Sequence, residues 1–174
     1  MIGVYDYTVL ATYLSLAFGV SGILAAMNGS PYSALLCLMV SGLLDAFDGR
    51  IARTKKNRTE QEKRFGIQID SLNDVVCFGV LPGVIGASLG GGEWWLRASV
   101  LFYVLAALIR LAYFNVTEEE RQSATNEHRH YYLGVPVTAA SFVMPIFWAL
   151  PLRLGSAQAV IYAVVLAHHA LLFI

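Results

Sequence analysis

Four aspartates stand in stretches of sequence that are otherwise largely apolar, and they form two pairs at helical spacing. Asp45 and Asp48 are three residues apart, and Asp70 and Asp74 are four residues apart. Residues at either spacing share one face of an α-helix, so two helices each present a pair of carboxylates. A carboxylate inside a membrane-spanning helix costs roughly 2.5 kcal/mol or more and by default indicates a functional site.

The two pairs are expected to meet level with each other. If the first helix runs toward one membrane surface and the second runs back from it, Asp45 lies about 4.5 Å deeper than Asp48, and Asp74 lies about 6 Å deeper than Asp70. Asp48 then faces Asp70, and Asp45 faces Asp74. Four carboxylates at low dielectric repel one another or take up protons unless cations lie between them. Ligands that are all oxygen favour Mg²⁺, Mn²⁺ or Ca²⁺, so the sequence predicts a divalent-metal site.

Two other interpretations of the aspartates stay open. They could form structural ion pairs with Arg50, Arg53 or Arg110, or they could line a path for protons or cations in a transporter. A transporter is expected to carry an inverted repeat, and no internal repeat is visible in the sequence.

Small residues and an arginine accompany the carboxylates. Gly49 follows Asp48 directly, Ala52 continues the same helix face, and Gly66 precedes Asp70 by one turn. Glycine weakens a helix, so these positions indicate close approach of a ligand or of a neighbouring helix. Arg53 can reach a phosphate with its fork of donors. Together these features predict a diphosphate site at the membrane surface.

The composition requires that membrane helices hold these residues. Of 174 residues, 57% are hydrophobic and only 14% are charged, with a mean hydropathy of +0.59. A soluble domain normally carries roughly 25% charged residues. These values exclude a soluble globular fold, a disordered chain and a generally basic protein that binds nucleic acid. Cys37 and Cys77 both lie in apolar runs, where free thiols pack as small hydrophobes.

The sequence predicts an all-α integral membrane protein, with residues 1–174 forming one domain. We expect six transmembrane helices in a single bundle, with a polar cavity open to the cytoplasmic side. A span needs about 20 residues, and turn signals such as Asn28-Gly29-Ser30-Pro31 and Gly90-Gly91-Gly92 separate the apolar runs. The expected helices cover about residues 6–27, 32–55, 66–89, 94–115, 133–151 and 154–174.

The basic residues predict the orientation. Seven of the 12 lysines and arginines fall between Arg50 and Arg64, which we expect to be a loop, and two more lie in the expected loop at 117–130. The opposite side has only Arg97 and Arg153. The positive-inside rule places both basic loops and both termini in the cytoplasm. The protein is therefore predicted to be a multi-pass protein of the cell membrane, with its site facing the cytoplasm.

The residues around the aspartates resemble the signature of the CDP-alcohol phosphotransferase family. Asp45-Ala-Phe-Asp48-Gly49-Arg-Ile-Ala52-Arg53, followed by Gly66-Ile-Gln-Ile-Asp70-Ser-Leu-Asn-Asp74, contains all eight fixed residues of that signature. The spacer between its two halves, residues 54–65, has 12 residues, where the family usually has eight. Within the family, the segments that begin at Asp70, Arg110 and Tyr132 are similar to the phosphatidylserine synthase branch.

The resemblance implies an enzyme of phospholipid biosynthesis, which transfers the phosphatidyl group of CDP-diacylglycerol to L-serine and releases CMP. It implies Mg²⁺ or Mn²⁺, in one or two ions, held by the four aspartates, with Asp74 as general base. It further implies a homodimer in the lipid bilayer.

The remaining site residues are predicted from this mechanism. Gly49, Ala52, Arg53 and Gly66 are predicted to bind the CDP group. Arg110, Asn115 and Thr138 are candidates for binding a phosphate or the acceptor, with a structural ion pair as the alternative for Arg110. Glycerol 3-phosphate or an inositol phosphate remain alternative acceptors, and each would call for further basic residues in the cavity.

Overall fold

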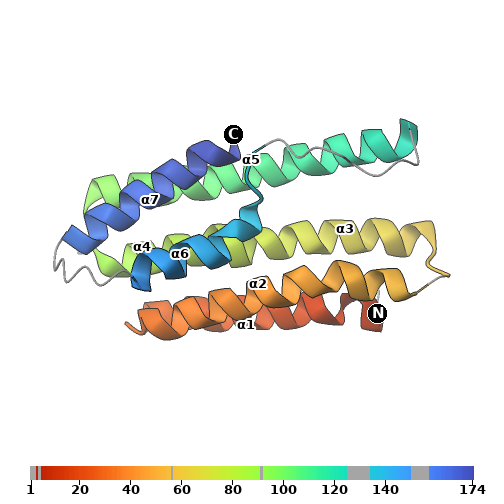
Figure 1. The fold of residues 1–174 in the computed structure, drawn as a ribbon, viewed down its shortest axis with the longest axis horizontal. Helices are drawn as coiled ribbons and strands as arrows, with labels where there is room; N and C mark the ends of the chain where they lie inside the picture. The colour runs from red at the N-terminus through yellow and green to blue at the C-terminus, as the bar shows by residue number, and fades with distance from the viewer. Residues whose placement is uncertain (1–2, 4, 56, 91, 125–133, 150–156) are drawn as a thin grey trace.

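The described part of the chain is built entirely from helices. The structure, a computed structural model, describes residues 3, 5–55, 57–90, 92–124, 134–149 and 157–174. The helices form an elongated bundle whose members run along its long axis (Figure 1). They are the 3₁₀ turn η1 (Tyr7–Val9), α1 (Leu10–Met27), α2 (Pro31–Thr54), α3 (Glu60–Asp74), the π-helical segment η2 (Val75–Val80), α4 (Leu81–Leu89), α5 (Trp94–Ala124), the 3₁₀ turn η3 (Val137–Ala139), α6 (Ala140–Ala149) and α7 (Ala157–Phe173).

Local sequence explains where α2 and α3 begin. Gly29 takes a positive φ of 71° in the turn after α1, a conformation that glycine adopts without strain, and Pro31 occupies the first turn of α2. Thr59 and Glu62 form a capping box, in which each side chain accepts a hydrogen bond from the other residue's backbone N–H. This box starts α3 at Glu60.

Two predicted boundaries were wrong, and both helices extend further toward the polar end of the bundle. The helix predicted over 66–89 begins six residues earlier, at Glu60, and runs through η2 and α4 to Leu89. The helix predicted over 94–115 continues to Ala124. The segment 50–64 is therefore helical at both ends rather than a loop. Apolar content marks only the part of a helix that lies in a membrane, and it gives no signal for polar turns beyond it.

The other predicted helices are present, but the one predicted over 133–151 begins later than expected. Residues 134–136 are not helical, because Gly134 takes a positive φ of 74° and Pro136 is extended, and α6 begins at Ala140 after η3. η1 and α1 cover the helix predicted over 6–27, and α2 covers the one predicted over 32–55. α6 and α7 lie within the ranges 133–151 and 154–174, of which 133 and 150–156 lie outside the described residues. Of the two basic residues in the loop predicted over 117–130, Arg121 lies in α5 and Arg129 lies outside the described residues. Arg153 lies outside them as well.

Small residues allow the helices to pack closely. A Cβ atom added at Gly19 on α1 would overlap Cys77, and one added at Gly42 on α2 would overlap Ser141 on α6. A Cβ atom at Gly86 on α4 would lie 2.9 Å from the ring of Tyr162 on α7. Close approach at small residues is typical of membrane helices.

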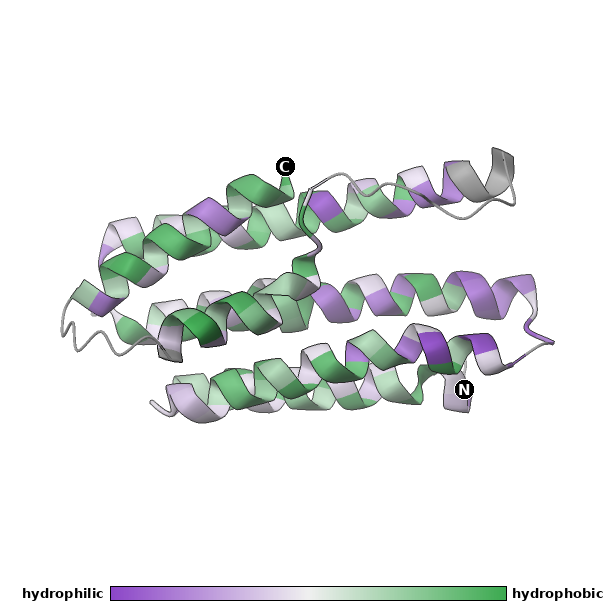
Figure 2. Ribbon diagram, viewed as in Figure 1, coloured by the Kyte–Doolittle hydropathy of each residue, from purple (hydrophilic) through white to green (hydrophobic). Residues whose placement is uncertain are grey.

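The bundle has an apolar part and a polar end. Hydrophilic residues gather where α2, α3 and α5 reach beyond the other helices, and the rest is predominantly hydrophobic (Figure 2). Three helices are long and apolar enough to cross a membrane: Tyr7–Met27, Glu60–Leu89 and Trp94–Glu120. Val137–Trp148 and Ala157–Phe173 are shorter apolar helices. Many large hydrophobic side chains are exposed on the outer face, as expected for a lipid-facing surface.

Candidate functional site

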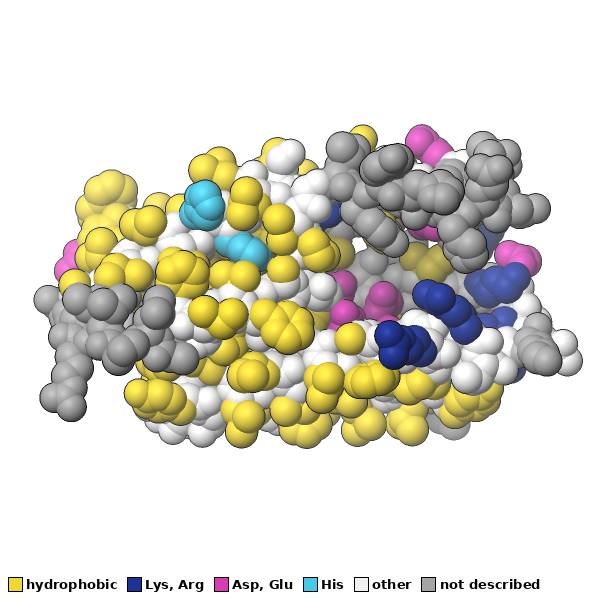
Figure 3. All heavy atoms as spheres, viewed as in Figure 1, with side chains coloured by type: hydrophobic (Ala, Val, Ile, Leu, Met, Phe, Trp, Pro, Cys, Tyr) yellow, Lys and Arg dark blue, Asp and Glu magenta, His cyan; other side chains and the backbone are white. Residues whose placement is uncertain are grey.

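The four aspartates come together in the space between α2 and α3, both of which pack against α1. Carboxylate oxygens of Asp45, Asp70 and Asp74 all lie within 4.8 Å of one another. Asp74 is 8% exposed and Asp48 is 9% exposed. Carboxylates are visible in a hollow of the surface near the middle of the molecule, with Lys and Arg side chains beside it (Figure 3). The helical spacing in the sequence therefore predicted the gathering of these side chains correctly.

The pairing across the two helices is the one expected from their depth. The Asp45 carboxyl group lies against that of Asp74, and the Asp48 group lies against that of Asp70. Asp48 has an additional partner, because the Thr12 hydroxyl donates a hydrogen bond to its Oδ2 atom at 3.2 Å. Asp48 thus contacts both Thr12 on α1 and Asp70 on α3.

The chemistry of this group fits a divalent cation. Oδ1 of Asp70 and Oδ1 of Asp74 are buried and have no hydrogen-bond partner among the described residues. None of the four aspartates forms an ion pair with an arginine of the described chain, so the structural ion pairs left open by the sequence are not found there. Converging carboxylate oxygens without donors are the ligand set that Mg²⁺ and similar hard cations accept.

A buried polar network supports the aspartates from behind. The Ser15 and Ser41 hydroxyls are 2.7 Å apart, linking α1 to α2. The Asn73 amide donates to Ser15 Oγ at 3.2 Å, and the Cys77 thiol donates to Asn73 Oδ1 at 3.2 Å. Cys77 is therefore buried as expected, but it also takes part in hydrogen bonding. Sequence analysis missed Ser15 and Thr12, whose signal was two polar residues three apart within an apolar helix.

A cavity of about 150 Å³ lies beside Asp48 and Asp70, between α1, α2 and α3. Gly49, Ala52 and Gly66, all predicted to bind CDP, line it. A Cβ atom on Gly49 would meet nothing within 4 Å, so this glycine faces open space. The complete lining is Thr8, Val9, Thr12, Asp48, Gly49, Ala52, Arg58, Lys63, Gly66, Ile67 and Asp70.

The cations of this cavity differ from the predicted one. Arg53 is exposed on the last turn of α2 and is not part of the lining. The lining cations are Arg58 and Lys63, which sequence analysis counted only as part of the basic segment. Lys63 forms an ion pair with Glu60 at 2.6 Å.

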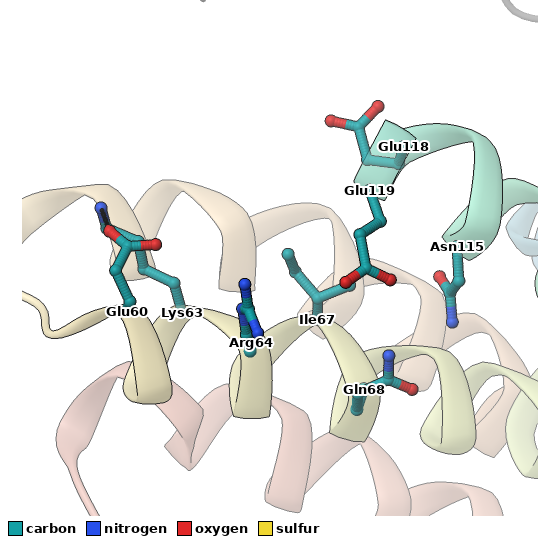
Figure 4. A pocket seen from close by; sticks show the side chains of 8 residues that line it. All are labelled: Glu60, Lys63, Arg64, Ile67, Gln68, Asn115, Glu118 and Glu119. Carbon is teal, nitrogen blue, oxygen red and sulfur yellow. Dashed lines mark hydrogen bonds and ion pairs between the residues drawn. The ribbon is translucent and has the colours of Figure 1, made fainter. Parts of the chain in front are cut away.

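A second cavity, of about 210 Å³, lies between α3 and the distal part of α5 (Figure 4). It carries both signs of charge, with Lys63 and Arg64 on α3 and Glu118 and Glu119 on α5. Asn115 lines it as well, and the Asn115 amide oxygen accepts a hydrogen bond from the Ser71 hydroxyl at 2.8 Å. The complete lining is Glu60, Lys63, Arg64, Ile67, Gln68, Asn115, Glu118 and Glu119. Lys63 and Ile67 border both cavities.

The other two predicted acceptor residues lie outside these cavities. Arg110 donates hydrogen bonds to the backbone carbonyls of Phe173 and Gly134, each at 3.4 Å. Thr138 is half-buried in η3, where its carbonyl accepts a hydrogen bond from Ser141. Of the three residues, the structure brings only Asn115 to a cavity wall.

Ion pairs fasten the end of α2 to its neighbours. The Lys55 ammonium group contacts the carboxylates of Asp6 and Glu62. The hydrogen bond from Lys55 lowers the pKa of Asp6 below its usual value, and the same partners raise the pKa of Lys55. These contacts tie the segment before α1 to the connection between α2 and α3.

The chain is similar to proteins of one family. The family model described as CDP-alcohol phosphatidyltransferase matches residues 8–173. A CDP-diacylglycerol–serine O-phosphatidyltransferase of Mycobacterium tuberculosis strain H37Rv is 30% identical over 147 residues, which cover 83% of this chain and 49% of that protein.

Two further relatives show the same partial coverage. A CDP-diacylglycerol–serine O-phosphatidyltransferase of Helicobacter pylori strain 26695 is 33% identical over 143 residues, covering 80% of this chain and 56% of that protein. An archaetidylserine synthase of Methanothermobacter thermautotrophicus is 29% identical over 140 residues, with the same two coverages. The chain thus spans about half the length of the curated relatives that it matches.

Proposed function

The chain belongs to the CDP-alcohol phosphatidyltransferase family, and from this premise we propose that it is an enzyme of phospholipid biosynthesis. In this proposal it transfers the phosphatidyl group of CDP-diacylglycerol to L-serine, which gives phosphatidylserine and CMP. The observation that carries the proposal is the convergence of Asp45, Asp70 and Asp74 within 4.8 Å, directly beside a cavity large enough for part of a nucleotide. Relatives named as serine transferases favour serine as the acceptor.

The four aspartates would hold one or two divalent cations, Mg²⁺ or Mn²⁺. The buried oxygens of Asp70 and Asp74 that lack donors support this assignment, with Asp48 as the outermost ligand. When bound, such an ion would stabilise negative charge on the attacking and leaving oxygens of phosphoryl transfer. The Thr12 hydroxyl would keep the Asp48 carboxylate in place.

The nucleotide would lie in the cavity between α1, α2 and α3. Gly49 and Ala52 give α2 a surface free of side chains that would obstruct a ligand. Gly66, also predicted to bind CDP, lines the same cavity on α3, where the Arg58 side chain lies over it. Arg53, exposed on the last turn of α2 outside the lining, stays a candidate contact for a nucleotide phosphate. The diacylglycerol tails would remain in the bilayer, beside the apolar outer face of the bundle.

Asp74 would accept the proton of the serine hydroxyl. The serine oxygen then forms a bond to the lipid-side phosphorus, the bond from that phosphorus to the oxygen of CMP breaks, and the proton stays on the Asp74 carboxylate. Two features support Asp74 as the base: it is the deeper of the two aspartates on α3 in the proposed topology, and its Oδ1 has no hydrogen-bond donor among the described residues. General-base catalysis requires such a group within hydrogen-bond reach of the hydroxyl.

The cavity between α3 and α5 supports an amino acid as acceptor. Lys63 and Arg64 suit a carboxylate, and Glu118 and Glu119 suit an ammonium group (Figure 4). An alcohol that carries a phosphate would meet the same two glutamates as like charges. Asn115 would bind the acceptor on the inner side of this cavity, and Arg110 and Thr138 remain candidates at the same level.

We propose six transmembrane helices, three more than the helices that meet the length criterion. α2 would cross together with α1, since the two pack along their lengths, and α6 and α7 would complete the bundle. The polar end with the two cavities would face the cytoplasm, and the protein would work as a homodimer in the cell membrane. Residues 1–174 would form one domain.

Purified protein with CDP-diacylglycerol, Mn²⁺ or Mg²⁺ and each alcohol in turn tests the reaction through CMP release. We expect CMP with L-serine and far less with glycerol 3-phosphate or an inositol phosphate. Absence of CMP with every alcohol would overturn the enzyme assignment. Release with glycerol 3-phosphate alone would overturn serine as the acceptor. Chelation of the metal should abolish release in either case.

A further inference from the structure

Arg58 lies in the short connection between α2 and α3, and its side chain folds back onto α3. Its Nη2 atom donates a hydrogen bond to the backbone carbonyl of Glu62 at 3.2 Å. The same nitrogen lies 2.7 Å from the point that a Cβ atom on Gly66 would occupy. Because Gly66 has no side chain, the guanidinium group can occupy this place on the surface of α3.

This position puts a cation into the cavity that holds Asp48 and Asp70. Lys63, the other lining cation, is already paired with Glu60. Arg58 forms no ion pair with any described residue. Arg58 is therefore the cation of this cavity whose charge the described chain does not balance with a direct carboxylate partner.

One donor of Arg58 is buried without an acceptor. The Nε atom has no hydrogen-bond partner among the described residues. A buried N–H group without a partner is unfavourable, and an arginine fork matches the oxygens of a phosphate group with two parallel hydrogen bonds. A ligand with phosphate oxygens in this cavity would satisfy both the donor and the charge.

We propose that Arg58 is a binding residue for the diphosphate of the nucleotide substrate. The absence of a side chain at Gly66 makes room for its guanidinium group. The proposal rests on the proposed function for the identity of the nucleotide, whereas the anion-binding role follows from the cavity itself. The longer connection between the signature halves supplies this cation. Arg53, which the sequence favoured, is exposed outside the lining.

Binding of cytidine diphosphate in the presence of Mg²⁺, measured by calorimetry on the purified full chain, tests the role of Arg58. We expect Arg58→Gln to weaken binding about tenfold or more, and Arg58→Lys to recover part of the loss. With CDP-diacylglycerol as substrate, the KM should rise by a similar factor while kcat changes little. The matched control is Arg50→Gln, which removes the same charge from an exposed arginine that lies over the Phe47 ring.

A double-mutant cycle tests whether Gly66 positions the Arg58 guanidinium group. Gly66→Ala should displace the guanidinium group and weaken binding of cytidine diphosphate in the presence of Arg58. In an Arg58→Ala background the same Gly66→Ala change should have little further effect, since the displaced group is gone. An equal loss of nucleotide binding in both backgrounds would show that the ligand contacts Gly66 directly. That result would overturn the role of Gly66 in positioning Arg58.

The outcomes separate this inference from the proposed function. Unchanged nucleotide binding in a folded Arg58→Gln variant, or an equal loss in Arg50→Gln, would overturn the role of Arg58 while CMP release by the unmodified protein stood. Absence of CMP release with every alcohol, together with Arg58-dependent binding of cytidine diphosphate, would overturn the reaction and support the binding site. Thermal unfolding in detergent checks that each variant is folded.

Discussion

Asp74 differs from the other aspartates in being both strongly buried and next to a supporting network. It is 8% exposed, it follows Asn73 directly, and its carboxyl group lies against that of Asp45. Asn73 in turn is fixed by Ser15 and Cys77. These contacts fix the residue before Asp74 between α1 and η2. In the proposed mechanism, this network would help to position Asp74 as the general base.

Asp74→Asn should lower kcat for CMP release by about 10²-fold or more, because the amide cannot take the proton of the acceptor hydroxyl. The measurement is the rate with saturating CDP-diacylglycerol and L-serine. Asp6→Asn is the matched control, since it makes the same chemical change at a carboxylate that contacts Lys55 outside the cavities. We expect that control to keep its activity.

Metal dependence then separates the two roles assigned to Asp74. If the variant regained full activity at high Mn²⁺ concentration, Asp74 would be a metal ligand only, and its role as the base would be wrong. A rate that stays low at every metal concentration is the result we expect.

At the scale of the elements, two glycines on α2 have different surroundings. Gly42 lies in a close contact with Ser141 on α6, whereas Gly49 faces open space beside the cavity. The two positions are seven residues apart, or about two helical turns, and so lie on nearly the same face of α2. One face of α2 therefore packs against α6 at Gly42 and borders the cavity at Gly49.

Gly42→Ala should destabilise the protein by about 1–3 kcal/mol, because the added methyl group overlaps Ser141 and forces α2 away from α6. Gly49→Ala should leave the fold unchanged and instead raise the KM for CDP-diacylglycerol. Thermal unfolding and CMP-release kinetics on both variants test this contrast. Rescue of Gly42→Ala by Ser141→Gly would identify the contact, and equal stability of the two single variants would contradict it.

At the scale of the whole molecule, the length of α5 sets the outline of the polar end. Its 31 residues correspond to about 46 Å of helix, against about 30 Å for the hydrocarbon core of a bilayer. α3 is extended in the same direction (Figure 1). Residues of this projecting part of both helices line the cavity between them. In the proposed topology, a water-soluble acceptor would reach the cavity there without crossing the membrane.

The topology of α2 can be measured with one exposed cysteine at a time, since the native Cys77 is buried. In a Cys37→Ala background, Asn28→Cys and Asn57→Cys place exposed thiols just before and just after α2. We expect a membrane-impermeant maleimide to label position 28 in intact cells, and position 57 only after permeabilisation. The parent without either new cysteine is the control. Labelling of both positions from the same side would show that α2 does not span.

The sequence by itself determined the chemistry of the four carboxylates and their pairing across the two helices. Helical periodicity converts the spacing of Asp45, Asp48, Asp70 and Asp74 into faces and depths, so the pairing across α2 and α3 followed from residue numbers. The apolar runs likewise gave the existence of the helices, because burial in lipid requires a continuous hydrophobic stretch. Both are local properties, which a linear pattern records.

Only the tertiary structure decided which residue of α1 contacts the carboxylates and which cation enters the cavity. Asp48 turns toward Thr12 on a different helix, and Arg58 rather than Arg53 lies over Gly66. The path of a connection and the approach of one helix to another depend on packing between residues that are far apart in the chain. Spacing along the sequence fixes directions within a single helix, but it does not determine distances between helices.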